Sequence, residues 1–280
     1  MTDAGVAEPS LRDFSGTLLL VGAGKMGSAM LEGWVALGLD PARLTVLEPQ
    51  PSGELAALAA RGLRLNPVLP APEAPDVIVI AVKPQTAPEV APILRQITGP
   101  LTLVVSIMAG RTLQFLARAL PDRAIVRAMP NTPAAIGRGI TVAVANGNVS
   151  ADQRAFAHRL LAATGAVEWV DDEGLLDAVT AVSGSGPAYV FLLAESLARA
   201  GVAAGLPEGL AARLARTTVA GAGELLHRSE LDAALLRQNV TSQGGTTAAA
   251  LAVLMADDGL EPLLKRAVAA ATHRGRELAG

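Results

Sequence analysis

The feature that most constrains the fold is a glycine-rich turn near the amino terminus, placed between an apolar run and a helical pattern. Gly22, Gly24 and Gly27 follow the run that ends at Val21, and helical periodicity begins at Lys25. In such a unit the first glycine permits a tight turn, the second lets a pyrophosphate approach the backbone, and the third lets helix and strand pack closely. The helix amino terminus offers unpaired N–H groups to phosphates. The pattern predicts a dinucleotide-binding site at Gly22, Gly24, Lys25, Met26 and Gly27, with a turn that binds nothing as the alternative.

Short apolar runs alternate with helical patterns from Thr17 to about Glu168. The run 77–82 is apolar at every position, which is typical of a parallel strand covered on both faces. Strands are expected at 17–21, 44–47, 76–82, 101–107, 124–129 and 140–145, and helices at 25–37, 53–61, 86–96 and 112–120. This alternation predicts a doubly wound α/β domain of the Rossmann type.

The strand pattern stops after Asp171, and only helical patterns follow. They are expected at 175–182, 188–204, 207–227, 231–240, 246–256 and 260–279. The sequence therefore predicts an amino-terminal extension over 1–16, a dinucleotide-binding domain over 17–168 and an all-α domain over 169–280. Apolar residues surround much of the helix circumference at 190–194, which favours a homodimer or a larger homo-oligomer built from dimers. A tight monomeric core of alanine-rich helices is the alternative.

Composition excludes several classes of function. The 280 residues are 51% hydrophobic and 18% charged with a formal net charge of −3, so we expect neither wholesale disorder nor a nucleic-acid partner. The chain has no cysteine, which excludes disulfides, thiol nucleophiles and thiolate metal sites. Asp3, Glu8 and Pro9 stand where a signal peptide would be apolar, and no uncharged apolar stretch reaches the roughly 20 residues of a membrane helix. We expect a soluble, cytoplasmic protein without a metal or a membrane partner, whose residues 1–16 are loose.

Further candidate cofactor contacts lie at the carboxyl ends of predicted strands, where open α/β sheets bind ligands. Glu48 stands where a carboxylate accepts hydrogen bonds from both ribose hydroxyls, repels a 2′-phosphate and so favours NADH. A solvated loop glutamate is the alternative; Arg43 lies too early to bind a 2′-phosphate, whereas Arg61 could fold back. The cofactor is therefore NADPH or NADH. The other candidates, each of which could instead be part of an ordinary loop, are Ala81, Val82, Lys83, Pro84, Met108, Ala109 and Asn131.

Six segments of the chain resemble the pyrroline-5-carboxylate reductases in order and at similar spacing. They are 22–27, 81–84, 127–133, 183–189, 201–207 and 241–247, and the resemblance covers 17–278. It implies the NAD(P)H-dependent reduction of 1-pyrroline-5-carboxylate to L-proline, the last step of proline synthesis. A cyclic imine is basic enough to be protonated before hydride arrives, so this chemistry requires no strong protein acid.

The resemblance places the substrate at the loop 242–247. It implies that Ser242, Gly244, Gly245 and Thr246 hold the substrate carboxylate, that Thr247 hydrogen-bonds the ring nitrogen, and that a neighbouring subunit supplies the loop. Backbone N–H groups at a helix amino terminus suit a carboxylate. From the residues alone, Thr246 or Thr247 could instead be a helix cap.

The segment 183–189 contains two further glycines but follows a helical pattern, whereas a phosphate loop follows a strand. We interpret it as a close helix crossing beside the nicotinamide, with Ser183 or Ser185 as a cap and Pro187 in the first helical turn. Glu195 is a carboxylate on an otherwise apolar helix, where such residues reach solvent more often than they act as acids, so it is not in the catalytic set.

Departures from the family pattern flank the substrate loop. Gln243, Gln238 and Arg237 stand where many members have proline, an acidic residue and lysine, which puts fine specificity in doubt. A β-hydroxyacid dehydrogenase shares the expected architecture but uses a lysine in its helical domain, and here Lys265 is the first lysine of that region. A catalytically silent NAD-binding regulatory protein is the second alternative, against which the intact substrate loop argues.

Overall fold

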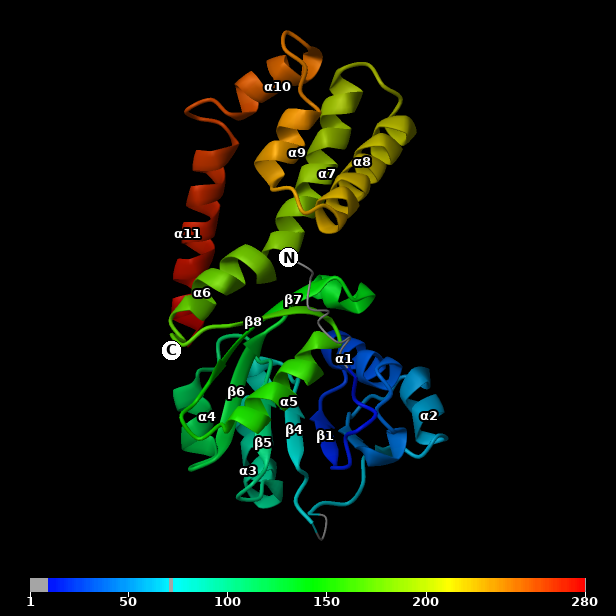
Figure 1. Cartoon of the computed structure of the whole chain (residues 1–280), viewed down its shortest axis with the longest axis vertical. Helices are drawn as coiled ribbons and strands as arrows, with labels where there is room; N and C mark the ends of the chain where they lie inside the picture. Colours follow the sequence, from blue (N-terminus) through cyan, green and yellow to red (C-terminus); the bar gives the residue numbers. More distant parts are fainter. Residues whose placement is uncertain (1–9, 71–72, 280) are drawn as a thin grey trace, which may run out of the picture. The chain divides into compact units, whose positions relative to one another are not determined.

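The computed structural model describes residues 10–70 and 73–279, which divide into two compact units (Figure 1). The first unit contains the described residues up to Gly184 together with those from Arg274 onward, and the second unit is Ser185–His273. The α/β class followed by an all-helical region, as predicted from the sequence, is confirmed.

Among the residues described, the first unit is built on an eight-stranded sheet with the order β3-β2-β1-β4-β5-β6-β7-β8. All neighbouring strands are parallel except β6 and β7, which are antiparallel. Each predicted strand is present with its ends within two residues. The strands are β1 (Leu18–Val21), β2 (Leu44–Leu47), β3 (Arg64–Leu65), β4 (Val77–Ile80), β5 (Leu103–Ser106), β6 (Ala124–Met129), β7 (Gly139–Ala145) and β8 (Gly165–Trp169).

Helices cover both faces of this sheet, which explains why strands β1 and β4 are apolar at every position. One core layer joins alternate strand residues to α1 and α5, and the fully buried Trp34 donates its ring N–H to the Leu160 carbonyl at 2.8 Å. The opposite layer joins the other strand residues to α3 and α4. The helices of this unit are α1 (Lys25–Ala36), α2 (Gly53–Ala59), α3 (Ala87–Ile97), α4 (Leu113–Ala119), α5 (Ala151–Ala162) and α6 (Leu175–Val179).

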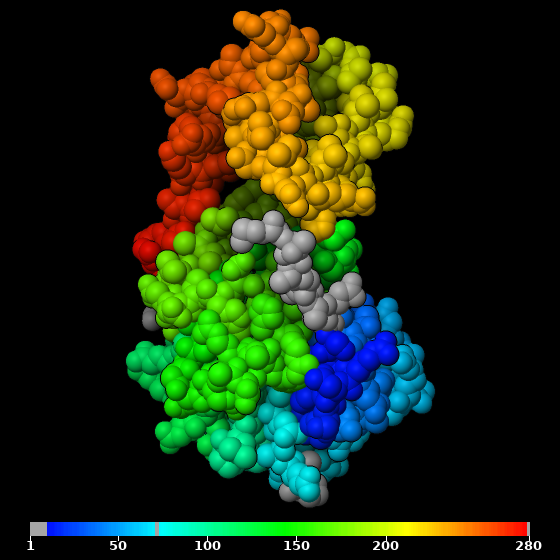
Figure 2. Space-filling view, in the orientation of Figure 1, coloured from blue at the N-terminus to red at the C-terminus, as the bar shows by residue number. Residues whose placement is uncertain are grey.

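The described part of the amino-terminal segment is packed, so the expectation of a loose extension is wrong for residues 10–16. Leu11 is fully buried in the core layer of α1, and its N–H donates to the Leu37 carbonyl at 3.0 Å. Phe14 stacks on Phe156 of α5 with 4.5 Å between ring centroids. In Figure 2 the dark blue start of the described chain lies next to green surface of the same unit. Burial of Leu11 and Phe14 offsets the entropy of ordering this segment.

Helix α5 and strands β3 and β8 were not predicted from the sequence. The capping box that begins α5 is complete, because Ser150 Oγ accepts from the Gln153 N–H and the Gln153 side chain accepts from the Ser150 N–H. Strand β8 begins at Gly165, whose φ of +137° and close approach to the Gly139 backbone exclude a side chain.

The second unit is helical throughout its described residues. Helices α7 and α8 pack where Gly201 meets Ala211, since a Cβ on Gly201 would lie 3.2 Å from the Ala211 side chain. The unit buries few large apolar groups of its own, and Phe191 is 69% exposed. The helices are α7 (Gly186–Ala203), α8 (Glu208–Arg228), α9 (Ala233–Asn239), α10 (Thr246–Leu254) and α11 (Leu260–Ala279), of which the last residues belong to the first unit.

A continuous helical stretch, Leu175–Ala203, is long and apolar enough to cross a membrane by length and composition alone. A packed helix of a soluble protein passes the same test. Glu195 and Arg199 on this stretch form an exposed ion pair at 3.1 Å, so Glu195 has the solvent-facing role expected of it.

Candidate active site

The glycine turn of the first unit has the geometry that its sequence predicts. Gly22 has φ +92°, and a Cβ there would lie 2.9 Å from the Ala81 carbonyl oxygen. A Cβ on Gly27 would overlap the Gly22 carbonyl, so helix α1 lies against the turn at a distance only glycine allows. At Gly24, by contrast, nothing lies within 4 Å of the Cβ position. The backbone N–H groups after Gly24, at Lys25 and Met26, begin α1 without a side-chain cap, which leaves them free for a phosphate.

A cavity of about 690 Å³ opens beside this turn at the carboxyl ends of β1, β2 and β4. This volume is in the usual range for a small-molecule site, and the position is the switch point of the strand order, where α/β sheets bind ligands. Six predicted residues line it, namely Gly22, Gly24, Glu48, Ala81, Val82 and Lys83. Pro84 begins the 3-10 turn next to Lys83, whereas Met108, Ala109 and Asn131 do not line this cavity.

Glu48 extends into this site and is held by the backbone around it. Its Oε2 accepts from the Ala23 N–H at 2.7 Å, and its Oε1 accepts from the Gln50 N–H at 3.0 Å. Asn66, which the sequence reading missed, accepts from the Glu48 N–H at 2.9 Å and donates to the Glu48 carbonyl at 2.8 Å. Arg43 instead contacts the Ser15 carbonyl, and Arg61 does not line the cavity.

Arg111 is a second residue that the sequence reading missed. Its guanidinium donates to the Pro84 carbonyl from Nε at 3.1 Å and from Nη2 at 2.8 Å, and lies 4.7 Å from the Phe115 ring centre. These contacts fix the loop after β4 to the loop after β5. Met108 in that second loop is 3% exposed, and its side chain packs in the core.

Asn131 ties the end of β6 to the π-helical turn Thr180–Gly184. Its Oδ1 accepts from the Ile140 N–H at 2.9 Å and its Nδ2 donates to the Ser183 carbonyl at 3.2 Å. The expectation that Ser183 or Ser185 caps a helix is wrong. The Ser183 hydroxyl donates back to the Val179 carbonyl at 2.9 Å, and Ser185 precedes α7 without a side-chain cap bond.

The buried Arg127 forms an ion pair with Glu173, whose side chain is 27% exposed. Arg127 of β6 is 5% exposed, and its Nη1 lies 2.6 Å from Glu173 Oε1. The same oxygen accepts from the Leu113 N–H at 2.7 Å, at the first turn of α4. Glu173 therefore joins β6 and α4 to the loop before α6.

In the second unit, the loop 242–247 leads directly into α10. Gly244 has φ +71°, and Gly245 occupies the N-cap position without a side-chain cap bond. Thr246 and Thr247 are the first two residues of α10, so neither is the helix cap that the residues alone allowed. Thr247 is half-buried and Thr246 is exposed. The first N–H groups of α10 lack intrahelical partners, which suits an anion.

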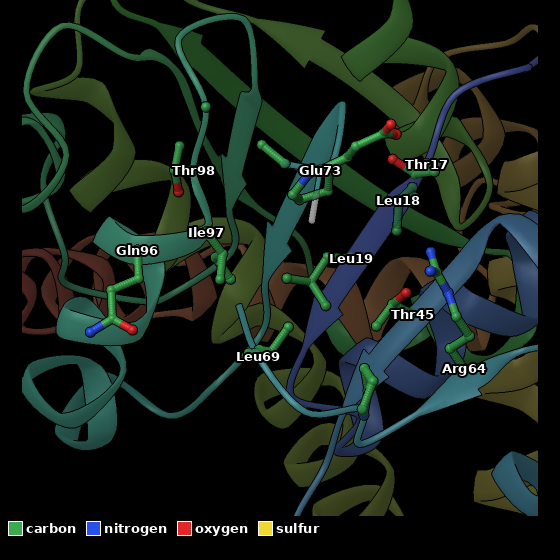
Figure 3. A pocket seen from close by; sticks show the side chains of 14 residues that line it. Thr17, Leu18, Leu19, Thr45, Arg64, Leu69, Glu73, Gln96, Ile97 and Thr98 are labelled. Carbon is green, nitrogen blue, oxygen red and sulfur yellow. The ribbon is translucent and has the colours of Figure 1, made fainter. Parts of the chain in front are cut away.

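A second cavity, of about 560 Å³, contains none of the predicted site residues (Figure 3). Thr17 and Thr45 line it near the starts of β1 and β2, and Ile97 and Thr98 line it at the end of α3. It shares Pro67, Leu69 and Gln96 with the cavity beside the glycine turn. In the described parts of the chain, no group of three or more His, Asp or Glu side chains could hold a metal.

The fold and the cavity at its switch point define an NAD(P)-dependent oxidoreductase with a separate helical region. The family described as NADP oxidoreductase coenzyme F420-dependent matches residues 17–110, and the family described as pyrroline-5-carboxylate reductase dimerisation matches residues 173–278. A pyrroline-5-carboxylate reductase of Synechocystis is 42% identical over 92% of this chain and 97% of that relative. One of Pseudomonas aeruginosa is 41% identical over 94% and 96%.

Solved structures agree with these relatives. A pyrroline-5-carboxylate reductase from Coxiella burnetii has a TM-score of 0.83 at 34% identity, covering 95% of this chain and 99% of that one. The Plasmodium falciparum enzyme with NADP bound has a TM-score of 0.78 at 28% identity, with the same coverage. The chain belongs to the pyrroline-5-carboxylate reductase family, as its six motifs predict. The family catalyses the NAD(P)H-dependent last step of proline biosynthesis.

Proposed function

We propose that this chain reduces 1-pyrroline-5-carboxylate to L-proline with NAD(P)H bound along the carboxyl edge of the sheet. The observation that carries the proposal, together with family membership, is the glycine turn that opens into a cavity of about 690 Å³ at the β1–β4 switch point. The cofactor contacts that we propose are Gly22, Gly24, Lys25, Met26, Gly27, Glu48, Ala81, Val82, Lys83, Pro84, Met108, Ala109 and Asn131.

Bound NAD(P)H supplies the hydride that adds to the carbon of the C=N bond. The groups of this chain then have three tasks: to hold the substrate carboxylate, to orient the ring nitrogen and to exclude water from the reacting atoms. The proposal assigns the carboxylate to Ser242, Gly244, Gly245 and Thr246, because the first turn of α10 presents N–H groups without intrahelical partners.

Thr247 is the catalytic residue in this proposal. Its hydroxyl oxygen accepts a hydrogen bond from the N–H of the protonated imine, which fixes the ring before hydride arrives. After the reduction the nitrogen keeps that proton as an amine and takes another from water, so the protein needs no strong acid. This assignment is supported by the position of Thr247 in the first turn of α10, half-buried beside the loop.

The dimerisation-family match supports a homo-oligomer with a small-molecule substrate. We propose more specifically that the oligomer is built from dimers, in which the 242–247 loop of one subunit holds the substrate beside the cofactor of the neighbouring subunit. We also propose that the protein is cytoplasmic. The functional division that we propose assigns 17–168 to the cofactor and 169–280 to dimerisation and substrate. The exposed apolar side chains of α7 and α8, such as Phe191 and Leu214, support the dimer.

The test is an assay of purified protein with pyrroline-5-carboxylate and, separately, NADH and NADPH. We expect the absorbance of at least one reduced cofactor to fall only when the imine is present, with proline as the product. Oxidation of neither cofactor, by a protein that still binds nucleotide, would exclude this function.

A further inference from the structure

Four hydrogen bonds hold Glu48 in one position at the edge of the cofactor cavity. Two fix its carboxylate, from the N–H groups of Ala23 and Gln50 at 2.7 and 3.0 Å. Two fix its backbone, because the Asn66 amide bonds both the N–H and the carbonyl of Glu48, at 2.9 and 2.8 Å. Each carboxylate oxygen accepts one of these bonds and keeps a lone pair for another donor.

Asn66 suits this role because of its backbone. It follows β3 with φ +48°, in the left-handed region that asparagine adopts more readily than other non-glycine residues. Its own N–H donates to the Val46 carbonyl at 2.9 Å, which continues the pairing with β2. Both Asn66 and Glu48 line the cavity, so the amide that fixes Glu48 belongs to the same wall as the carboxylate.

The charges around this wall favour a diol over a phosphate. The charged residues that line the cavity are Glu48, Glu89 and Lys83. A 2′-phosphate beside Glu48 would place like charges together in a partly enclosed site, whereas ribose hydroxyls would donate to the free lone pairs. Repulsion of the wrong ligand gives specificity as effectively as attraction of the right one.

We propose that the Asn66–Glu48 pair makes this chain select NADH over NADPH, with Glu48 as the ribose acceptor and Asn66 as the residue that positions it. The proposal rests on the proposed function and names the cofactor for the same site. It separates this chain from the Plasmodium falciparum relative, whose structure holds NADP.

The experiment uses nucleotides that report on the ribose alone. Calorimetry on the full chain compares AMP with adenosine 2′,5′-bisphosphate, and no imine is present. We expect the wild type to bind AMP more tightly. Glu48→Gln keeps the size and an acceptor but loses the charge, and should move the affinity ratio at least about ten-fold toward the bisphosphate. Equal wild-type affinities for the two nucleotides, or an unchanged ratio in Glu48→Gln, would overturn the proposal.

Asn66→Gly tests the positioning role, because glycine keeps the left-handed backbone and removes both side-chain bonds. We expect AMP binding to weaken about five-fold while bisphosphate binding stays unchanged or improves. The matched control is Asn148→Gly. The Asn148 side chain donates to the Arg123 carbonyl at 3.2 Å, and Asn148 does not line the cavity. The control should leave the ratio unchanged.

A double-mutant cycle separates positioning from general weakening of the fold. In the Glu48→Gln background, Asn66→Gly should change the ratio much less than it does in the wild type, because Asn66 acts through the Glu48 carboxylate. Equal effects in the two backgrounds would remove Asn66 from the proposal. A chain that fails to reduce the imine would contradict the proposed function, whereas these nucleotide ratios would still decide the cofactor preference.

Discussion

The two units of this chain differ in how much of their own apolar surface they bury. The first unit buries both faces of its sheet and leaves Trp34 and Leu11 without exposed surface. The buried residues of the second unit's helices α7 and α8 are only Ala211 and Ala215 in the described chain, and its 242–247 loop is largely exposed. The first unit is therefore a complete nucleotide-binding body, whereas the second has an apolar surface suited to a partner.

The first unit should depend most on the ion pair that its buried Arg127 forms with Glu173. In Glu173→Ala, Arg127 loses its partner while it stays enclosed, and the Leu113 N–H loses its acceptor. We expect the free energy of unfolding to fall by about 3–5 kcal/mol, measured by urea denaturation. Glu168→Ala, at an exposed carboxylate on β8, is the control and should change it by less than about 0.5 kcal/mol. Similar small losses in both variants would contradict this role for Glu173.

The second unit should depend on its partner instead. Phe191→Asp places a charge on an exposed side chain of α7, which costs little in an isolated chain but much in a covered interface. We expect the dissociation constant of the oligomer to rise at least about 100-fold, or about 2.7 kcal/mol, by sedimentation at several concentrations. Leu101→Asp, at a residue of the first unit that is 86% exposed, should leave the oligomer intact. If the two substitutions had the same effect, the contrast between the units would fail.

The sequence predicted those elements of the first unit whose residue pattern is set within a single strand or turn. The run 77–82 is apolar at every position because helices cover both faces of the sheet, so its pattern alone identified it. Strand β3 was missed because two residues carry no periodicity. Helix α5 was missed although Ser150 and Gln153 form a capping box that spacing could have revealed.

The candidate site was predictable in its glycines and less so in its supporting contacts. Gly22 and Gly27 were found because a backbone that excludes Cβ requires glycine at fixed spacing. Asn66 and Arg111 were missed because their partners, Glu48 and Pro84, lie 18 and 27 positions away in the chain. Such hydrogen bonds depend on which strands lie side by side in the sheet, and the pattern of single residues does not predict that order.

Thr247 tests whether the helical region contributes chemistry as well as contact. Thr247→Ala should lower kcat/KM by about 10- to 100-fold, because a hydrogen bond to a charged nitrogen is worth about 1.5–3 kcal/mol. NAD(P)H binding by the first unit should be unchanged in the same variant, as measured by cofactor fluorescence. Thr247→Ser keeps the hydroxyl and should recover most of the turnover. Loss of turnover in the serine variant as large as in the alanine variant would argue against the hydroxyl.

The smallest expected effect distinguishes an ion pair between distant parts of the chain from an ion pair within one helix. The hydrogen bond from Arg159 lowers the pKa of Asp13, and that from Lys265 lowers the pKa of Glu261. A depressed carboxyl pKa adds stability above the unfolded pKa and loses it as pH falls through the folded pKa. Asp13→Asn should therefore lower the melting temperature slightly at neutral pH, and this difference should vanish once the pH falls below the lowered pKa of Asp13. Asp13 joins the amino-terminal segment to α5, 146 positions away, whereas Glu261 and Lys265 are four apart on α11. Hydrogen exchange at the Leu11 N–H should accordingly quicken in Asp13→Asn and not in Glu261→Gln, and equal protection in both variants would show that burial of Leu11 alone holds the segment.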